Sequence, residues 1–275
     1  MRVAICRGHM NVIIWLQEHQ ILGTNRVLIN PAAYFGRFDL IKWLQTNLPS
    51  HSGSNSFAVE VAAKRGYFNI VQWLHENRPH TFSSFIIDWD AEGGHLEIVK
   101  WLHEKYPNNC TTRAMNKAAR YGHLHVIQWL QKNRSEGCTT DAMNWAAGKG
   151  HLEVVKWLHK NRNEGCTTEA MDMAAKNGRI KVIKWLHLNR KEGCTTYAMD
   201  LAIKFEHINT LKWLQENRTE GCTIPGMIYA LKYDKLEIVK WLHENRTEFN
   251  ISDLISNAKP NGIVKRWYDN TFPTV

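Results

Sequence analysis

Residues 136–163, EGCTTDAMNWAAGKGHLEVVKWLHKNRN, are followed at 164–191 by EGCTTEAMDMAAKNGRIKVIKWLHLNRK, which repeats them almost position for position. Nine tryptophans carry the same register through the chain, 28 residues apart except for one step of 30: Trp15, Trp43, Trp73, Trp101, Trp129, Trp157, Trp185, Trp213 and Trp241. This period indicates a solenoid, because so short a unit cannot enclose a core and must bury its apolar face against its neighbours.

Each unit predicts two helices joined by a tight turn. Residues 152–160 place apolar side chains over more than half of a helical wheel, so this helix packs on several sides. Residues 142–149 place alanine and methionine on one face, where small side chains permit close helix contact. Gly150 separates the two helices, and Thr139 or Thr140 is the expected N-cap. Pro225 fits the first helical turn of a later copy, and Asn161 and Gly165 suit the exit from the second helix.

A leucine-rich repeat could also have a 28-residue period. Its strand needs alternating leucines, whereas AMNWAA and VVKWL have helical spacing. We therefore predict an all-α solenoid of helix-turn-helix repeats.

The composition is that of a folded protein, with 44% hydrophobic residues in 275 and a net charge of +9. Acidic proteins, nucleic acid and anionic membrane surfaces are all candidate partners for such a charge. No apolar run approaches the roughly 18 residues that span a bilayer, and Arg7, Gly8 and His9 interrupt the segment where a signal peptide needs an apolar core. We therefore expect an intracellular protein, cytoplasmic or nuclear, that has no membrane partner and is monomeric.

Several repeats resemble the ankyrin family. AAGKGHLEVVKWL, AEGGHLEIVKWL and AARYGHLHVIQWL are similar to the second half of an ankyrin repeat. The repeats lack the Thr-Pro-Leu-His opening of that family and are about five residues shorter. On this basis we assign residues 1–20 to a truncated first repeat, 21–248 to eight ankyrin-like repeats, and 249–275 to a degenerate C-terminal capping repeat. Because the chain starts inside a repeat, we expect it to be a fragment of a longer array.

The repeated histidines and cysteines do not predict a metal site or a cofactor. Residues in matching positions of adjacent repeats lie about 10 Å apart, too far for shared coordination or a disulfide. We expect buried free thiols at the five repeated cysteines: Cys110, Cys138, Cys166, Cys194 and Cys222. In the ankyrin family the histidine after the turn glycine makes structural hydrogen bonds. No nucleophile, phosphate-loop or paired-carboxylate motif appears, so we expect no enzymatic activity.

Two charged features have structural and functional interpretations. Arginines five residues after tryptophan and glutamates two residues further on form a column that we interpret as a surface charge ladder; a phosphate-binding stripe is the alternative. Asp90 stands where other repeats have mostly alanine. A carboxylate at a helix contact needs a partner, so it marks either a local salt bridge or a ligand-facing position.

The variable positions of the first helix predict where a partner binds. The two residues before the turn glycine, which face the concave groove in the ankyrin family, alternate between basic and aromatic, and the position of Trp145 also varies. The predicted partner-binding residues are Tyr34, Phe35, Lys64, Arg65, Trp89, Arg120, Tyr121, Trp145, Lys149, Lys176, Lys204, Phe205, Lys232 and Tyr233. Core packing is the alternative at Trp89 and Trp145.

Aromatic anchors among basic residues suit protein binding, in which the aromatic groups supply affinity and the charges steer association. We therefore expect a non-enzymatic scaffold whose groove binds a partner protein with an acidic surface. The alternative is single-stranded nucleic acid, with phosphates on Lys and Arg and bases on Tyr and Phe. A third interpretation is that the alternation only keeps the groove soluble.

Overall fold

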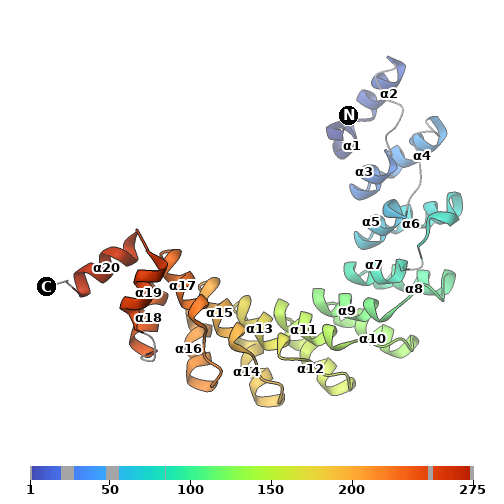
Figure 1. The fold of residues 1–275 in the computed structure, drawn as a ribbon. Helices are drawn as coiled ribbons and strands as arrows, with labels where there is room; N and C mark the ends of the chain where they lie inside the picture. Colours follow the sequence, from blue (N-terminus) through green and yellow to red (C-terminus); the bar gives the residue numbers. More distant parts are fainter. Residues whose placement is uncertain (1, 20–27, 48–55, 84, 247–249, 273–275) are drawn as a thin grey trace. The chain divides into compact units, whose positions relative to one another are not determined.

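The computed structural model describes residues 2–19, 28–47, 56–83, 85–246 and 250–272. The chain divides into two compact units, Met1–Cys138 and Thr139–Val275. The described residues of both units form helix pairs and no strand, as the repeat predicts. In each unit the first helices of the pairs lie side by side in one layer, and the second helices form another layer against them (Figure 1).

In the first unit, the first helices of the pairs are α1 (Arg2–Arg7), α3 (Ile29–Tyr34), α5 (Phe57–Lys64), α7 (Ile86–Gly93) and α9 (Thr112–Tyr121). The second helices are α2 (Met10–Glu18), α4 (Phe38–Asn47), α6 (Phe68–Asn77), α8 (Leu96–Lys105) and α10 (Leu124–Asn133). A short 3-10 helix, η2 (Pro79–Thr81), follows α6.

In the second unit, the first helices are α11 (Thr140–Lys149), α13 (Glu169–Lys176), α15 (Thr196–Lys204), α17 (Ile224–Lys232) and α19 (Ile251–Ala258). The second helices are α12 (Leu152–Asn161), α14 (Ile180–Asn189), α16 (Ile208–Asn217), α18 (Leu236–Asn245) and α20 (Ile263–Thr271). The last pair, α19 and α20, lies within the range assigned to a capping repeat.

The core of each repeat is built from the positions that define the sequence register. Ala146 and Ala147 of α11 are fully buried, and so are Ala174 and Ala175 of α13, the next first helix. These small side chains permit the close contact between the two helices. The second helices bury an aliphatic trio, which in α12 is Val154, Val155 and Leu158, while Trp157 is half-buried beside it.

Threonine is the N-cap of α9, α11, α13, α15 and α17, as predicted for α11. Thr139 is the N-cap of α11, and its hydroxyl accepts a hydrogen bond from the amide of Asp141 at 3.2 Å. Thr195 and Thr223 cap α15 and α17 in the same way. Pro225 lies in the first turn of α17, where its missing N–H leaves no helical bond unmade.

A second set of contacts, not expected from the sequence, links these caps to the preceding repeat. The Asp172 carboxylate of α13 accepts hydrogen bonds from the backbone amide of Thr195 at 2.9 Å and from its hydroxyl at 2.8 Å. Asp200 binds Thr223 with the same pattern, and Asp88 binds Thr111 in the first unit. Each buried or half-buried acid thus fixes the start of the next helix.

The turn after each first helix needs a left-handed backbone. Gly94 has φ 81°, and a Cβ there would overlap the ring of His123 from the next repeat, so both conformation and space require glycine. Acidic residues adopt the same conformation at Glu206 (φ 60°) and Asp234 (φ 59°). The residue facing Glu206 is then Lys235, whose Nζ lies 2.7 Å from the carboxylate.

Candidate functional site

The predicted partner-binding residues before each turn occupy the last turn of a first helix or the residue after it. The helix ends there in the left-handed turn, so these side chains project from the same end of every first helix. We call the exposed side chains at these positions the doublet surface. In the first unit it comprises Tyr34, Phe35, Lys64, Arg65, Arg120 and Tyr121. In the second unit it comprises Lys149, Lys176, Lys204, Phe205, Lys232 and Tyr233, of which Lys176 is half-buried.

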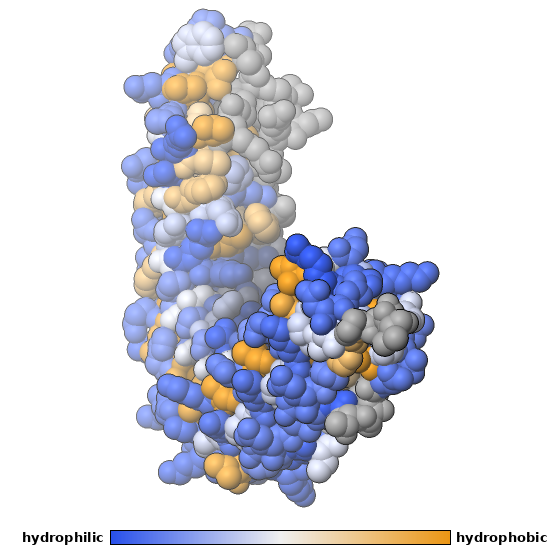
Figure 2. Space-filling model, turned by 90° about the vertical axis from the view of Figure 1, so that its left-hand side faces the viewer, coloured by the Kyte–Doolittle hydropathy of each residue, from blue (hydrophilic) through white to orange (hydrophobic). Residues whose placement is uncertain are grey.

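The face of the molecule in Figure 2 carries hydrophobic residues in small patches between hydrophilic ones. Several aromatic residues of the doublet surface are well exposed, including Phe205 at 44% and Tyr233 at 52%. Large aromatic rings that remain in contact with water beside basic groups are typical of surfaces that become buried on binding.

Glu92 organises the doublet surface of the first unit, although it is not among the predicted residues. It lies in the last turn of α7 at the position held by Lys64 in α5, and only 8% of it is exposed. Its carboxylate lies 2.7 Å from Lys64 Nζ and 3.0 Å from Lys117 Nζ, so it joins α5, α7 and α9. Burial alone would raise the pKa of Glu92, but hydrogen bonds from Lys64, Lys117 and Tyr121 outweigh this effect and lower it.

Trp89 and Lys117 form a cation–π pair within this cluster. Lys117 Nζ lies 3.4 Å from the centroid of the Trp89 ring, and both residues are half-buried. The ammonium group is thus held between the indole and the Glu92 carboxylate. Trp89 supports a neighbouring helix as well as facing solvent, so neither binding nor core packing alone describes its position.

The two arginines of the doublet surface in the first unit also lie beside aromatic rings. The Arg65 guanidinium lies 3.7 Å from the Tyr34 ring centroid, and the Arg120 guanidinium lies 5.7 Å from that of Tyr121. Phe35 packs edge-on against Tyr34 at 4.9 Å. The first unit therefore presents a surface whose charges are already engaged with its own side chains.

The second unit has the same residue types in a different arrangement. Lys176 and Lys204 place Nζ 5.5 and 5.9 Å from the Phe205 ring centroid, and Lys204 also lies 5.5 Å from the Tyr229 ring. Tyr229 packs against Tyr233 with centroids 4.3 Å apart. Tyr229 occupies the position of Trp145, and both are half-buried. Glu92, Lys117 and Tyr229 are thus contacts that the prediction missed. For Glu92, the sequence contained a usable signal, namely an acidic residue at a position that is otherwise mostly basic.

The prediction of a salt bridge at Asp90 is wrong. Asp90 is fully buried in α7, and both carboxylate oxygens are without a hydrogen-bond partner among the described residues. No described cation lies within ion-pair distance either. Burial raises the pKa of Asp90 well above its ordinary value. Because Asp90 is 0% exposed, its side chain does not reach the surface, and the alternative of a ligand-facing position is not supported either.

The arginine column is not a surface ladder. Arg190 pairs with Glu192 and Arg218 with Glu220, and these side chains are only 20–24% exposed. Arg190 also lies 3.3 Å from His159 Nδ1 of the preceding repeat, and Arg218 reaches Gly193 and the Cys194 thiol at the start of its own repeat. The column therefore forms clasps between consecutive repeats, and its charge is directed inward rather than toward a phosphate.

The histidines after the turn make structural hydrogen bonds, as the resemblance implies. His123 Nε2 lies 3.1 Å from the carbonyl of Glu92, and His207 Nε2 lies 3.0 Å from that of Lys176. The six cysteines are free, and the five repeated ones are buried. Burial raises the pKa of the Cys110 thiol to about 12, which disfavours the reactive thiolate. In the described residues no three histidine, cysteine or acidic side chains converge as a metal site would require.

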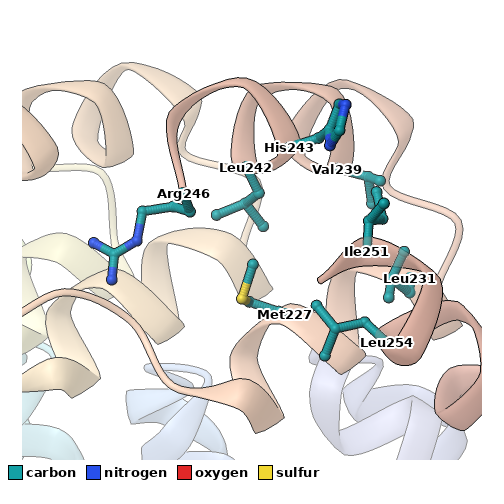
Figure 3. A pocket seen from close by; sticks show the side chains of 8 residues that line it. All are labelled: Met227, Leu231, Val239, Leu242, His243, Arg246, Ile251 and Leu254. Atoms are coloured by element: carbon teal, nitrogen blue, oxygen red, sulfur yellow. The ribbon is translucent and has the colours of Figure 1, made fainter. Parts of the chain in front are cut away.

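A small cavity lies between α17, α18 and α19. Figure 3 shows the apolar side chains of Met227, Leu231, Leu242 and Leu254 around it, with the Arg246 guanidinium directed away from them. Its volume of about 20 Å³ is enough for a single water molecule. It is a packing gap rather than a ligand site. None of the helices in the described ranges is long and apolar enough to cross a lipid bilayer.

The paired helices, their turn residues and the threonine caps define a helical repeat solenoid. A family model of ankyrin repeats, which describes three copies, matches residues 87–172 and again residues 170–253. These matches cover more than half of the chain, which therefore belongs to the ankyrin repeat family. Ankyrin repeats are generally protein–protein interaction modules built on extended repeat surfaces. No curated protein matches the sequence.

Proposed function

We propose that this chain is a non-enzymatic scaffold that binds a partner protein with an acidic surface through the doublet surface. The observation that carries the proposal is the recurrence of basic and aromatic side chains at one end of successive first helices. Exposed aromatic rings gain the most from being covered by a partner, and lysines and arginines favour acidic groups at the rim.

The geometry of the repeat supports this proposal. The helix contacts use buried alanines and aliphatic residues, and the exposed doublet residues lie outside this apolar core. Most of them can therefore vary without disturbing it, and Lys64, which pairs with the buried Glu92, is the exception. Trp89 and Trp145 belong to the proposed site as half-buried supports rather than as exposed anchors.

The test is capture from a whole-cell lysate at near-physiological salt, with and without nuclease treatment. The parent chain is compared with a variant carrying Glu at Lys64, Arg120, Lys149, Lys176, Lys204 and Lys232. A matched control carries Glu at six exposed lysines of second helices: Lys42, Lys132, Lys160, Lys181, Lys184 and Lys212. Circular dichroism verifies that both variants remain helical.

We expect a protein that is captured by the parent and the control in both lysates and lost in the doublet variant. Capture that disappears with nuclease would replace the proposal with nucleic-acid binding. Equal loss in both variants would show that net charge, rather than the doublet surface, controls binding.

A further inference from the structure

One difference between the two units lies at the position of the doublet surface two residues before the turn. In the second unit this position holds Lys176, Lys204 and Lys232 on the successive helices α13, α15 and α17. In the first unit the corresponding run over α5, α7 and α9 is Lys64, Glu92 and Arg120. An acidic residue thus interrupts the basic row in one unit and not in the other.

Glu92 reduces the attraction of the first unit for an external anion. It binds Lys64 and Lys117 at 2.7 and 3.0 Å, so an incoming carboxylate would have to compete with one that is already buried and in place. Displacing it would leave a desolvated acid without partners, which is costly. The positive charges of Lys64 and Lys117 are therefore largely satisfied internally.

The lysines of the second unit have no such partner. In the described residues, no carboxylate lies within 4 Å of the Nζ atoms of Lys176, Lys204 or Lys232. The acids in the following turns are engaged elsewhere. Glu206 binds Lys235, and Asp234 accepts the backbone amides of Ile263 and Val264 at the start of α20. Three adjacent helices therefore present ammonium groups beside Phe205 and Tyr233 without internal neutralisation.

The spacing of this row specifies the occupant. Packed helices lie about 10 Å apart. A peptide in the extended polyproline II conformation has three residues per turn and advances about 3.1 Å per residue, so every third side chain points to the same face. A carboxylate at every third residue thus meets a lysine on every helix, and apolar residues between them cover the exposed rings. We propose that the row Lys176, Lys204 and Lys232 binds an extended acidic segment of a partner protein, with Asp or Glu at every third position. This inference rests on the proposed function and specifies its ligand.

The aromatic contacts favour a peptide over single-stranded nucleic acid. Base stacking needs open ring faces. Phe205 shares its faces with two lysine ammonium groups, and Tyr229 packs against Tyr233. Aliphatic side chains do not need an open ring face and can pack against the exposed parts of Phe205 and Tyr233, which are 44% and 52% exposed.

The experiment measures fluorescence anisotropy with the full chain and defined probes. The first probe is a fluorescein-labelled 12-residue peptide with Glu at positions 2, 5, 8 and 11 and Leu, Ser and Gly elsewhere. The second has the same composition with its four Glu consecutive, and the third is a 12-nucleotide oligothymidine. The proteins are the parent, the Lys176→Gln/Lys204→Gln/Lys232→Gln variant, and a control with Lys181→Gln, Lys184→Gln and Lys212→Gln on α14 and α16, exposed lysines that change the net charge equally.

We expect the parent and the control to bind the spaced peptide about tenfold more tightly than the clustered one. The Lys176→Gln/Lys204→Gln/Lys232→Gln variant should lose this preference. Equal affinity for the two peptides, or an unchanged preference in the variant, would overturn the inference. So would tighter binding of oligothymidine than of the spaced peptide. If the spacing preference is absent while the lysate protein is still captured, the proposed function stands and only the ligand is wrong. If no protein is captured, the proposed function itself fails.

Discussion

Some residues that depart from the repeat make specific contacts with a neighbouring helix, whereas Asp90 makes no polar contact among the described residues. It replaces an alanine at a helix contact, is fully buried, and has no hydrogen-bond partner among the described residues. A buried polar group in this state costs folding free energy, because it loses its water without replacement.

Replacing Asp90 with alanine should therefore stabilise the chain. At pH 7.5 we expect the free energy of unfolding to rise by about 1–3 kcal/mol, the typical cost of an unsatisfied buried polar group. Urea denaturation followed by circular dichroism measures the change. Asp253→Ala, at an exposed acid of α19, is the control and should alter stability by less than about 0.5 kcal/mol.

The gain should depend on pH. Because burial raises the pKa of folded Asp90 above its unfolded value, its contribution to stability is fully present below the ordinary Asp pKa of about 3.9 and is lost as the pH rises toward the folded pKa. The advantage of the alanine variant should thus shrink as the pH falls from 7.5 toward 4. An advantage that is equal at both pH values would show that the carboxyl group does not change protonation on folding.

At the scale of helices, neighbouring repeats are joined by polar contacts as well as by the apolar core. Glu92 connects α7 to Lys64 of α5 and to Lys117 of α9. The arginine column and the Asp–Thr caps also join neighbouring repeats. Arg190 contacts His159 across 31 residues and Asp172 contacts Thr195 across 23, so each of these contacts spans one repeat boundary.

The Glu92→Gln variant should lose stability, because it leaves the half-buried Lys117 ammonium without its carboxylate. We expect a loss of about 1–3 kcal/mol at pH 7, measured by urea denaturation. The interactions with Lys64, Lys117 and Tyr121 lower the folded pKa of Glu92, so its contribution is present above the unfolded pKa of about 4.3 and disappears as the pH falls through the folded value. If the two proteins still differ by the full amount at a pH where Glu92 is protonated in the folded chain, the effect arises from packing rather than charge.

The arginine clasps should matter more than exposed ion pairs. Arg218→Ala removes the partner of Glu220 and the contact with Cys194, and both sites are mostly shielded from water. A loss of about 1–3 kcal/mol is expected, since the glutamate keeps its charge without compensation. Lys212→Ala on α16 is the matched control, with an effect below about 0.5 kcal/mol. If the two substitutions reduced the free energy of unfolding by similar amounts, the arginine column would behave as a solvent-exposed charge ladder.

At the scale of the molecule, the sequence predicts the framework better than the surface. Periodic tryptophans, alanine pairs and turn glycines each repeat, so their signal accumulates over many copies and places the helix pairs and the threonine caps correctly. The cluster around Glu92 and the isolated Asp90 occur once. Their surroundings depend on which side chains of adjacent repeats meet, and this depends on the packing of two helices rather than on any local pattern.

A solenoid distributes its stability through contacts between neighbours, so protection from hydrogen exchange should vary along a unit. In the second unit, α13 packs between α11 and α15, whereas α19 packs against α17 alone among the described first helices. Amides at Ala174 and Ala175 of α13 should therefore exchange at least about tenfold more slowly than those at Leu254 and Ile255 of α19, after correction for intrinsic rates. Hydrogen exchange with mass spectrometry on the full chain measures both peptides. Equal protection would mean that the second unit opens as one cooperative block, in which a partner bound along α13, α15 and α17 would protect α19 to the same extent.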